Sequence, residues 1–178
     1  MKILVLDHGS GYLPNLVDFL KDMNVDFDLR KPGVPIKGYR GVIASGGSLQ
    51  KENRIKILEW YKNFLLKSNT HFLGICLGHR ILGFCHGSRL MKSYEKGVIK
   101  ISFHKEFPLA PGMRNMKVYQ DHDFGLLSLP GTLENFASSK ECEIQAIKVI
   151  DKQQYGVQFH PEVEGHVILE NFIRICRR

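Results

Sequence analysis

A single cysteine stands where a buried strand is expected to turn sharply into a helix. The segment Gly74-Ile75-Cys76-Leu77-Gly78-His79 places one nucleophilic side chain between two glycines. This pattern is typical of a nucleophile elbow, with cysteine where hydrolases of the Gly-x-Ser-x-Gly type have serine. Such a turn exposes the sulfur at the carboxyl edge of a sheet, beside a helix N-terminus that favours a thiolate. The alternative interpretation is a small buried cysteine at a tight turn.

A cysteine nucleophile needs a base, and the segment Gly156-Val157-Gln158-Phe159-His160-Pro161-Glu162 offers one. An apolar strand brings His160 to its end, and Glu162 can turn back to hold one imidazole nitrogen while the other faces the thiol. The alternative is a strand-end histidine beside a surface glutamate. A weaker candidate base is His122, which is flanked by two aspartates. We therefore predict that Cys76, His160 and Glu162 form a catalytic triad.

Acyl transfer to a thiol also requires hydrogen-bond donors for the oxyanion of the tetrahedral intermediate. The backbone N–H of Leu77, directly after the cysteine, is one candidate. The turn Ser45-Gly46-Gly47-Ser48 offers a second at Gly47, where a Cβ would block the approach. The alternative is an ordinary flexible loop. No Gly-Lys-Ser/Thr follows this turn, so it lacks the pattern of a phosphate-binding loop, and the chain shows no other ATP-binding motif.

The pattern of apolar residues in the first half predicts an α/β fold. Short strands alternate with amphipathic helices in the order β-α-β-β-α-β, with strands near 3–6, 25–29, 41–44 and 72–75 and helices near 13–23 and 52–65. Such alternation predicts a three-layer fold, with a mostly parallel central sheet and helices on both faces.

The second half has a different texture. Short β-like pieces near 98–103, 116–119, 144–150 and 155–159 are separated by proline and glycine turns, and a last amphipathic helix carries Ile168, Leu169, Phe172 and Cys176 on one side. We predict a small antiparallel β portion here, within one domain that spans residues 1–178.

Composition and charge are those of a folded globular protein. Of the 178 residues, 43% are hydrophobic and 24% are charged, which argues against intrinsic disorder. The net charge is +7, from 25 basic and 18 acidic residues. Apart from Arg174, Arg177 and Arg178, the basic residues are spread along the chain. This distribution predicts a solvated basic surface rather than a nucleic-acid site.

The four cysteines, Cys76, Cys85, Cys142 and Cys176, form no C-x-x-C pair. Neither a disulfide framework nor a zinc site has the spacing it requires, so we expect no metal and a reducing, cytoplasmic location. The apolar run at 3–6 is too short for a signal peptide. No run approaches the about 20 apolar residues of a membrane span, so no membrane association is expected.

Taken together, the two motifs Gly-Ile-Cys-Leu-Gly-His and Gly-Val-Gln-Phe-His-Pro-Glu resemble those of the class I (triad-type) glutamine amidotransferase family. The resemblance runs from Lys2 to about Ile175. It implies that Cys76 attacks the side-chain amide of L-glutamine to form a thioester, that His160 shuttles the proton, and that Glu162 orients His160. Ammonia would then leave toward a separate synthetase.

The resemblance also implies where glutamine binds. Gly47 and Leu77 would supply the oxyanion N–H groups, and Asp121-His122-Asp123-Phe124 looks like the turn whose backbone helps hold the glutamine α-carboxylate. The implied substrate-binding residues are Gly46, Gly47, Arg80, Asp123 and Phe124. No cofactor is implied on this chain, since ATP and Mg²⁺ are expected on the partner.

Within the family, the sequence resembles the free-standing glutaminase subunit of archaeal-type GMP synthases. The similarity lies in the short length, the opening Asp7-His8-Gly9-Ser10-Gly11-Tyr12, and the residues after Glu162. The implied partner is an ATP-pyrophosphatase (synthetase) subunit of the GMP synthase type. Alternatives are the glutaminase of another synthase, a γ-glutamyl hydrolase of the same fold, and a non-catalytic regulatory subunit.

Three features depart from the family pattern. Arg80 stands where glutamine is usual, Ser48 stands where proline follows the double glycine, and the segment 163–169 is abbreviated. Arginine has five donors, no acceptor and a permanent charge, so it cannot imitate an amide. We expect the Arg80 side chain to point outward, because burying an unpaired guanidinium costs more than leaving a pocket position empty.

Overall fold

The two chemical motifs lie on neighbouring parallel strands of one sheet. A computed structural model describes residues 1–178, and its nine strands are ordered β2-β1-β3-β4-β9-β8-β7-β5-β6. The first five strands in this order run parallel to one another. Their bounds are Lys2–His8 for β1, Asp26–Arg30 for β2, Gly41–Gly47 for β3, His71–Ile75 for β4 and Gln154–Val157 for β9.

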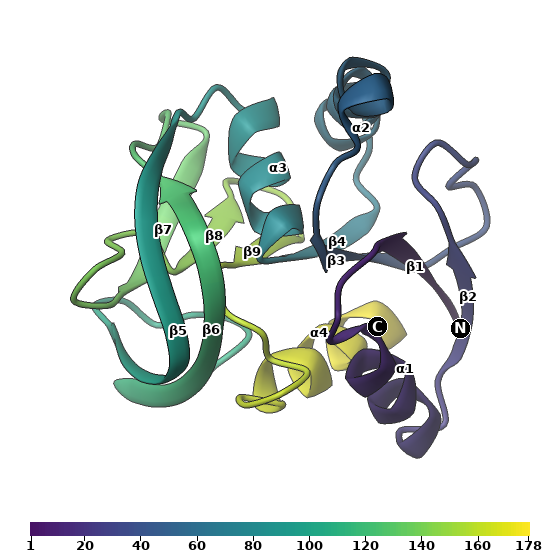
Figure 1. The fold of residues 1–178 in the computed structure, drawn as a ribbon. Coiled ribbons are helices and arrows are strands. Elements are labelled where there is room, and N and C mark those ends of the chain that lie inside the picture. The colour runs from purple at the N-terminus through teal and green to yellow at the C-terminus, as the bar shows by residue number, and fades with distance from the viewer.

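Helices cover both faces of this parallel part, as Figure 1 shows. Helices α1 (Leu13–Asp22) and α4 (Val167–Arg177) pack on one face. Helices α2 (Arg54–Lys67) and α3 (Leu77–Cys85) pack on the other, and a short 3-10 helix, Lys51–Asn53, precedes α2. The predicted α/β fold with helices on both faces is confirmed. No helix is long and apolar enough to cross a membrane.

The first strand shows why its sequence is continuously apolar. Ile3 and Val5 of β1 belong to the core under α1 and α4, whereas Leu4 and Leu6 belong to the core under α2 and α3. Successive side chains of a strand point to opposite faces, so a strand covered on both faces is apolar at every position. The short apolar runs in the sequence are therefore strands of a doubly covered sheet.

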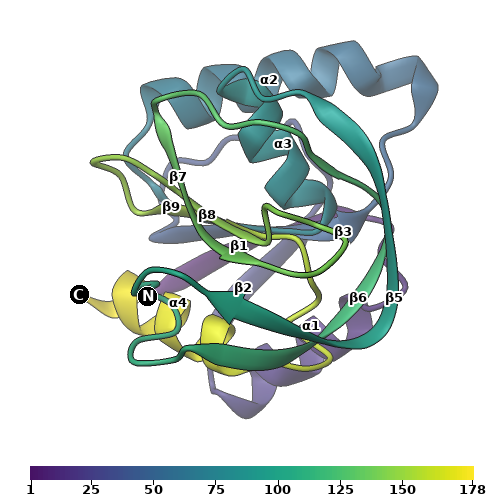
Figure 2. The same ribbon diagram turned by 90° about the vertical axis from the view of Figure 1, so that its left-hand side faces the viewer.

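The remaining strands form the antiparallel part of the sheet: β5 (Leu90–Phe103), β6 (Asn115–Leu126), β7 (Leu133–Ser138) and β8 (Ala146–Val149). Strands β5 and β6 form a long curved hairpin at the far side of the sheet (Figure 2). The sequence pattern predicts only the second half of β5 and does not predict β7. Both contain exposed polar residues that interrupt the apolar pattern.

The segment 121–124 belongs to β6, so its prediction as a turn is wrong. Pairing with β5 continues through it, with Asp121 opposite Lys96 and His122 opposite Glu95. An Asp-His-Asp sequence has the composition of a turn, but cross-strand pairs of opposite charge stabilise a ladder. The strand nevertheless carries these residues to the edge of the sheet where β4 ends.

Strand β9 brings the two motifs together. After passing through the antiparallel part, the chain returns beside β4, with Ile75 opposite Val157. The carboxyl ends of β4 and β9 therefore lie next to each other. Cys76 directly follows β4, and His160 follows β9.

Candidate active site

Cys76 occupies the sharp turn between β4 and α3. Its φ of +49° and ψ of −93° lie outside the regions that residues with side chains ordinarily adopt. A Cβ on Gly74 would lie 2.3 Å from the carbonyl carbon of Gly78, and a Cβ on Gly78 would lie 2.5 Å from the carbonyl oxygen of Ala44. The Cys76 N–H donates to the carbonyl oxygen of Val157 at 2.8 Å. This is the geometry of a nucleophile elbow, tied to the neighbouring strand.

His160 and Glu162 form a buried pair just beyond β9. Glu162 Oε1 lies 2.8 Å from His160 Nδ1, and the two side chains are 1% and 3% exposed, respectively. The ring of Tyr12 packs against the imidazole with 4.5 Å between centroids. Burial lowers the pKa of His160, but the neighbouring Cys76 and Glu162 outweigh this effect and raise it to about 10. The imidazole is therefore charged at neutral pH.

Because His160 Nδ1 faces Glu162, Nε2 is the nitrogen left to exchange a proton with the thiol. The imidazole and the thiol are close neighbours. A Cβ on Gly46 would lie 2.8 Å from His160 Cε1 and 3.5 Å from Cys76 Cβ. Gly46 thus packs against both residues and leaves no room for a side chain.

The glycine turn after β3 contributes backbone to the same place. Gly47 lines the same cavity as the cysteine, with φ of +122°, and a Cβ there would lie 2.2 Å from the carbonyl oxygen of His8. Only glycine fits this position. Leu77 is the first residue of α3, where helix geometry leaves the N–H without an intrahelical partner. The Ser48 N–H donates to the His8 carbonyl oxygen at 3.1 Å, a bond that proline could not form.

A cavity of about 340 Å³ lies over the elbow. This volume is at the small end of the range for small-molecule sites, roughly 300–1,000 Å³. Two carboxylates and one guanidinium face it, a mixture that suits a small zwitterion. The lining residues are Gly9, Ser10, Gly11, Tyr12, Gly47, Cys76, Arg80, Asp121, His122, Asp123, Phe124 and His160. Of the substrate-binding residues predicted from the sequence, Gly47, Arg80, Asp123 and Phe124 face the cavity, and Gly46 does not.

Arg80 points into this cavity, so the predicted outward orientation is wrong. Its Nη2 lies 3.8 Å from Cys76 Sγ, and its Nε lies 3.5 Å from the Cys76 carbonyl oxygen. The guanidinium is not the unpaired buried charge on which that prediction depended, because the residue is only half-buried and its donors reach two acceptors. Its place one helical turn after Cys76 puts the charge at the reacting end of the cavity.

We expect Arg80→Gln to lower the KM for glutamine by about twofold to fivefold. The guanidinium repels the substrate α-ammonium and takes space beside the sulfur, and two unit charges about 4 Å apart in a water-like medium interact by about 1 kcal/mol. Steady-state glutaminase kinetics would measure the change. Arg80→Met is the matched control, since it removes the charge without supplying an amide. An unchanged or higher KM in Arg80→Gln would show that arginine already suits the glutamine pocket.

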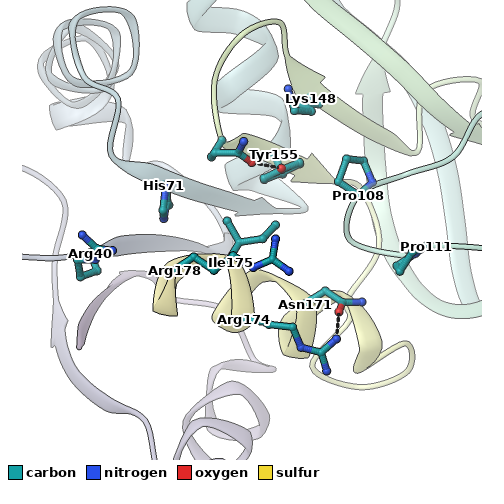
Figure 3. A pocket seen from close by; sticks show the side chains of 11 residues that line it. Arg40, His71, Pro108, Pro111, Lys148, Tyr155, Asn171, Arg174, Ile175 and Arg178 are labelled. Carbon is teal, nitrogen blue, oxygen red and sulfur yellow. Dashed lines mark hydrogen bonds between the residues drawn. The ribbon is translucent and has the colours of Figure 1, made fainter.

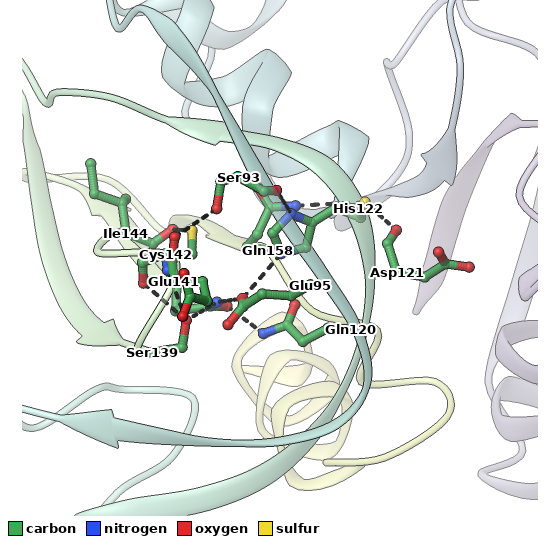
Figure 4. A network of polar contacts seen from close by, with 12 residues as sticks. Ser93, Glu95, Gln120, Asp121, His122, Ser139, Glu141, Cys142, Ile144 and Gln158 are labelled. Carbon is green, nitrogen blue, oxygen red and sulfur yellow. Dashed lines mark hydrogen bonds and ion pairs between the residues drawn. The ribbon is translucent and has the colours of Figure 1, made fainter.

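Two further residues at the site are not singled out by the sequence motifs. Gln158 is fully buried, and its Nε2 lies 3.7 Å from Cys76 Sγ (Figure 4). The Tyr12 hydroxyl donates to Asp121 Oδ2 at 2.7 Å, and the Asp121 carbonyl oxygen lies 3.8 Å from the sulfur. Strand alternation could have found Gln158, because residues two apart share a face and His160 is its neighbour. No local pattern distinguishes Tyr12.

A second cluster, separate from Cys76, adjoins the site. Ligand-type atoms of Glu95, His122 and Cys142 lie within 4.8 Å of one another (Figure 4). The Glu95 carboxylate lies 3.2 Å from His122 Nε2 and accepts from Gln145 Nε2 at 2.7 Å, while His122 Nδ1 donates to the Ser93 carbonyl oxygen at 2.7 Å. Burial raises the pKa of the Cys142 thiol. Since hydrogen bonds already engage these side chains, we interpret the cluster as support for β6.

Comparisons with known proteins agree with this fold and site. The sequence profile of the family described as glutamine amidotransferase class-I matches residues 4–175. The glutamine-hydrolysing subunit of GMP synthase from Pyrococcus abyssi is 32% identical over 98% of each chain. The protein of the same name from Sulfurisphaera tokodaii is 29% identical over 100% of each chain.

Solved structures show the same likeness. A candidate GMP synthase subunit from Thermoplasma acidophilum has a TM-score of 0.90 at 27% identity, covering 99% of this chain and 94% of that one. A glutamine amidotransferase from Thermotoga maritima has a TM-score of 0.78 at 22% identity, covering 99% and 82%, and shows the fold alone.

Fold and site together define an α/β protein with a cysteine at a nucleophile elbow and a histidine–glutamate pair beside it. The chain belongs to the class-I glutamine amidotransferase family. It is a cysteine-dependent glutamine amidotransferase.

Proposed function

We propose that this chain is the glutaminase subunit of a GMP synthase. It hydrolyses the side-chain amide of L-glutamine and supplies ammonia to a separate ATP-dependent synthetase subunit. The observation that carries the proposal is the cavity in which Cys76 meets the His160–Glu162 pair, in a chain similar over its full length to glutamine-hydrolysing subunits of GMP synthases.

In the first half-reaction, the Cys76 sulfur forms a bond to the amide carbon of glutamine. The negative charge moves to the carbonyl oxygen, where the N–H groups of Gly47 and Leu77 stabilise it. When this intermediate collapses, the carbon–nitrogen bond breaks and His160 donates a proton to the departing nitrogen. Ammonia leaves, and the glutamyl group remains on the sulfur as a thioester.

In the second half-reaction, His160 takes a proton from water and the oxygen attacks the thioester carbon. The carbon–sulfur bond then breaks, which releases glutamate and restores the cysteine. Glu162 acts through His160, because it holds Nδ1 and stabilises the imidazolium. Asp123 and Phe124 face the cavity beside this centre and would contact the amino-acid end of the substrate.

We expect glutamine hydrolysis to accelerate when the synthetase of a GMP synthase is added with its nucleotide substrates. Coupling between two sites of this kind is typically worth about 5-fold to 150-fold. Ammonia release would be measured with the chain alone, with the synthetase alone and with both, using Cys76→Ala as the control. High glutamine turnover that no synthetase changes would argue for an independent hydrolase.

A second candidate, a γ-glutamyl hydrolase, is favoured by one observation. The Arg80 guanidinium lies 3.8 Å from Cys76 Sγ, where it could bind a carboxylate on the leaving group of a γ-glutamyl peptide. Comparing kcat/KM for glutamine and γ-glutamyl-glutamate would separate the two functions. A preference for the peptide that disappears in Arg80→Gln would identify the hydrolase.

A further inference from the structure

A second, larger cavity lies at the opposite edge of the sheet from Cys76. Its volume is about 740 Å³. His71 begins β4, the strand that ends just before Cys76, and Arg40 directly precedes β3. The cavity therefore opens at the amino ends of the parallel strands, between these strand starts and α4, as the close view in Figure 3 shows. None of the proposed chemistry uses this place.

The cavity is strongly basic. Arg40, Lys148, Arg174 and Arg178 line it, together with His71, and none of its 11 lining residues is acidic. The two basic residues outside α4 come from distant parts of the sequence, Arg40 before β3 and Lys148 in β8. Positive charge in a concave place with protein walls focuses the field and attracts anions.

These charges have no acidic partners in the protein. None of the four basic side chains takes part in an ion pair. Arg174 Nη1 donates to Asn171 Oδ1 at 3.1 Å, and Arg40 Nε and Lys148 Nζ donate to backbone carbonyl oxygens at 3.4 and 3.2 Å. Neutral acceptors leave the charges uncompensated, whereas surface lysines elsewhere, such as Lys105, have a carboxylate.

His71 reports the same field. Its Nδ1 is buried and has no hydrogen-bond partner. Burial and then the charge of Arg40 lower the pKa of His71, so a proton is disfavoured there. The carboxyl end of α4 also lies beside the cavity, and a helix contributes about half a negative charge at that end. This opposes anion binding, but four full positive charges exceed it.

We propose that this cavity binds a small anion with at least two phosphate groups, held mainly by Arg40 and Arg174. Guanidinium groups match phosphate oxygens with paired hydrogen bonds, and two arginines on opposite walls suit two phosphates. The volume exceeds what one inorganic phosphate fills and falls within the range of small-molecule sites, roughly 300–1,000 Å³. The ligand class is thus an inorganic or organic di- or triphosphate.

Isothermal titration calorimetry with inorganic pyrophosphate as the probe tests this site, with inorganic phosphate and GMP as monophosphate comparisons. Pyrophosphate is expected to bind with one-to-one stoichiometry and about tenfold more tightly than the monophosphates. In Arg40→Gln/Arg174→Gln, its affinity should fall by about tenfold or more. The matched control is Arg54→Gln/Arg89→Gln, which removes the same charge from exposed positions and should bind as the wild type does.

Arg40 also holds the Cys176 carbonyl oxygen, so Lys148→Gln/Arg174→Gln serves as a second pocket variant, and circular dichroism would verify both folds. The proposal is overturned if pyrophosphate does not bind, or if both charge-removal variants weaken binding equally. It is also overturned if the pocket variants lose only association with a synthetase, which would make the cavity a docking surface for an acidic protein. Because the readout is binding, the result does not depend on the proposed glutaminase function.

Discussion

Replacing Cys76 with alanine is expected to reduce glutamine hydrolysis by about 10⁴-fold or more. The change removes the sulfur that forms the thioester, and the remaining oxyanion donors and binding contacts supply only residual catalysis over water. The fold should survive, because the side chain is small and the turn is fixed by Gly74, Gly78 and the bond from the Cys76 N–H to β9. Ammonia release by the purified variant would measure the loss.

A glutamine-mimicking electrophile should label Cys76 alone. Burial raises the pKa of Cys85 and Cys176 to about 12, and it also raises that of Cys142. Cys85 and Cys176 are packed in the two hydrophobic cores, whereas Cys76 also lines the small cavity. Peptide mass spectrometry would locate the label, and Cys85→Ala is the control that should keep both label and activity. Label on any other cysteine, or full activity in Cys76→Ala, would contradict the assignment.

The parts of the fold that could be predicted are those whose pattern depends on burial. Strands β1, β3 and β4 are short apolar runs because helices cover both of their faces. Strand β7 and the first half of β5 could not be predicted, because their outward positions carry charged or polar residues and their pairing partners are distant in sequence. The Asp-His-Asp segment of β6 resembles a turn in composition for the same reason.

The site shows a similar limit. The positions of Cys76 and His160 follow from local patterns, since each comes after a strand and the two strands are parallel. The direction of Arg80 does not, because it depends on whether acceptors lie within reach of the guanidinium. The structure supplies them in Cys76 itself. Likewise, no local pattern brings Arg40 and Lys148 to the cavity beside α4.

Among the residues beside the cysteine, His160 is expected to matter more than Glu162. Loss of the general acid and base in His160→Ala should reduce kcat/KM by about 10⁴-fold, and loss of the orienting carboxylate in Glu162→Gln by about 10²-fold. Glu164→Gln is the matched control, since that carboxylate is exposed two residues away. Equal rates in His160→Ala and the wild type would remove His160 from the mechanism.

The charge on His160 makes the stability of the protein depend on pH in a defined direction. Burial lowers the pKa of His160, while Cys76 and Glu162 raise it, from the ordinary 6.5 to about 10. Because the folded-state pKa is the higher one, protonated His160 stabilises the fold fully below about pH 6.5, and this contribution is lost as the pH rises toward about 10. The difference in unfolding free energy between the wild type and His160→Gln, measured by chemical denaturation, should therefore shrink across that window. In a Glu162→Gln background, which lacks the carboxylate that favours the imidazolium, the decline should begin at lower pH. A difference that is constant with pH would mean that His160 is neutral in the folded protein.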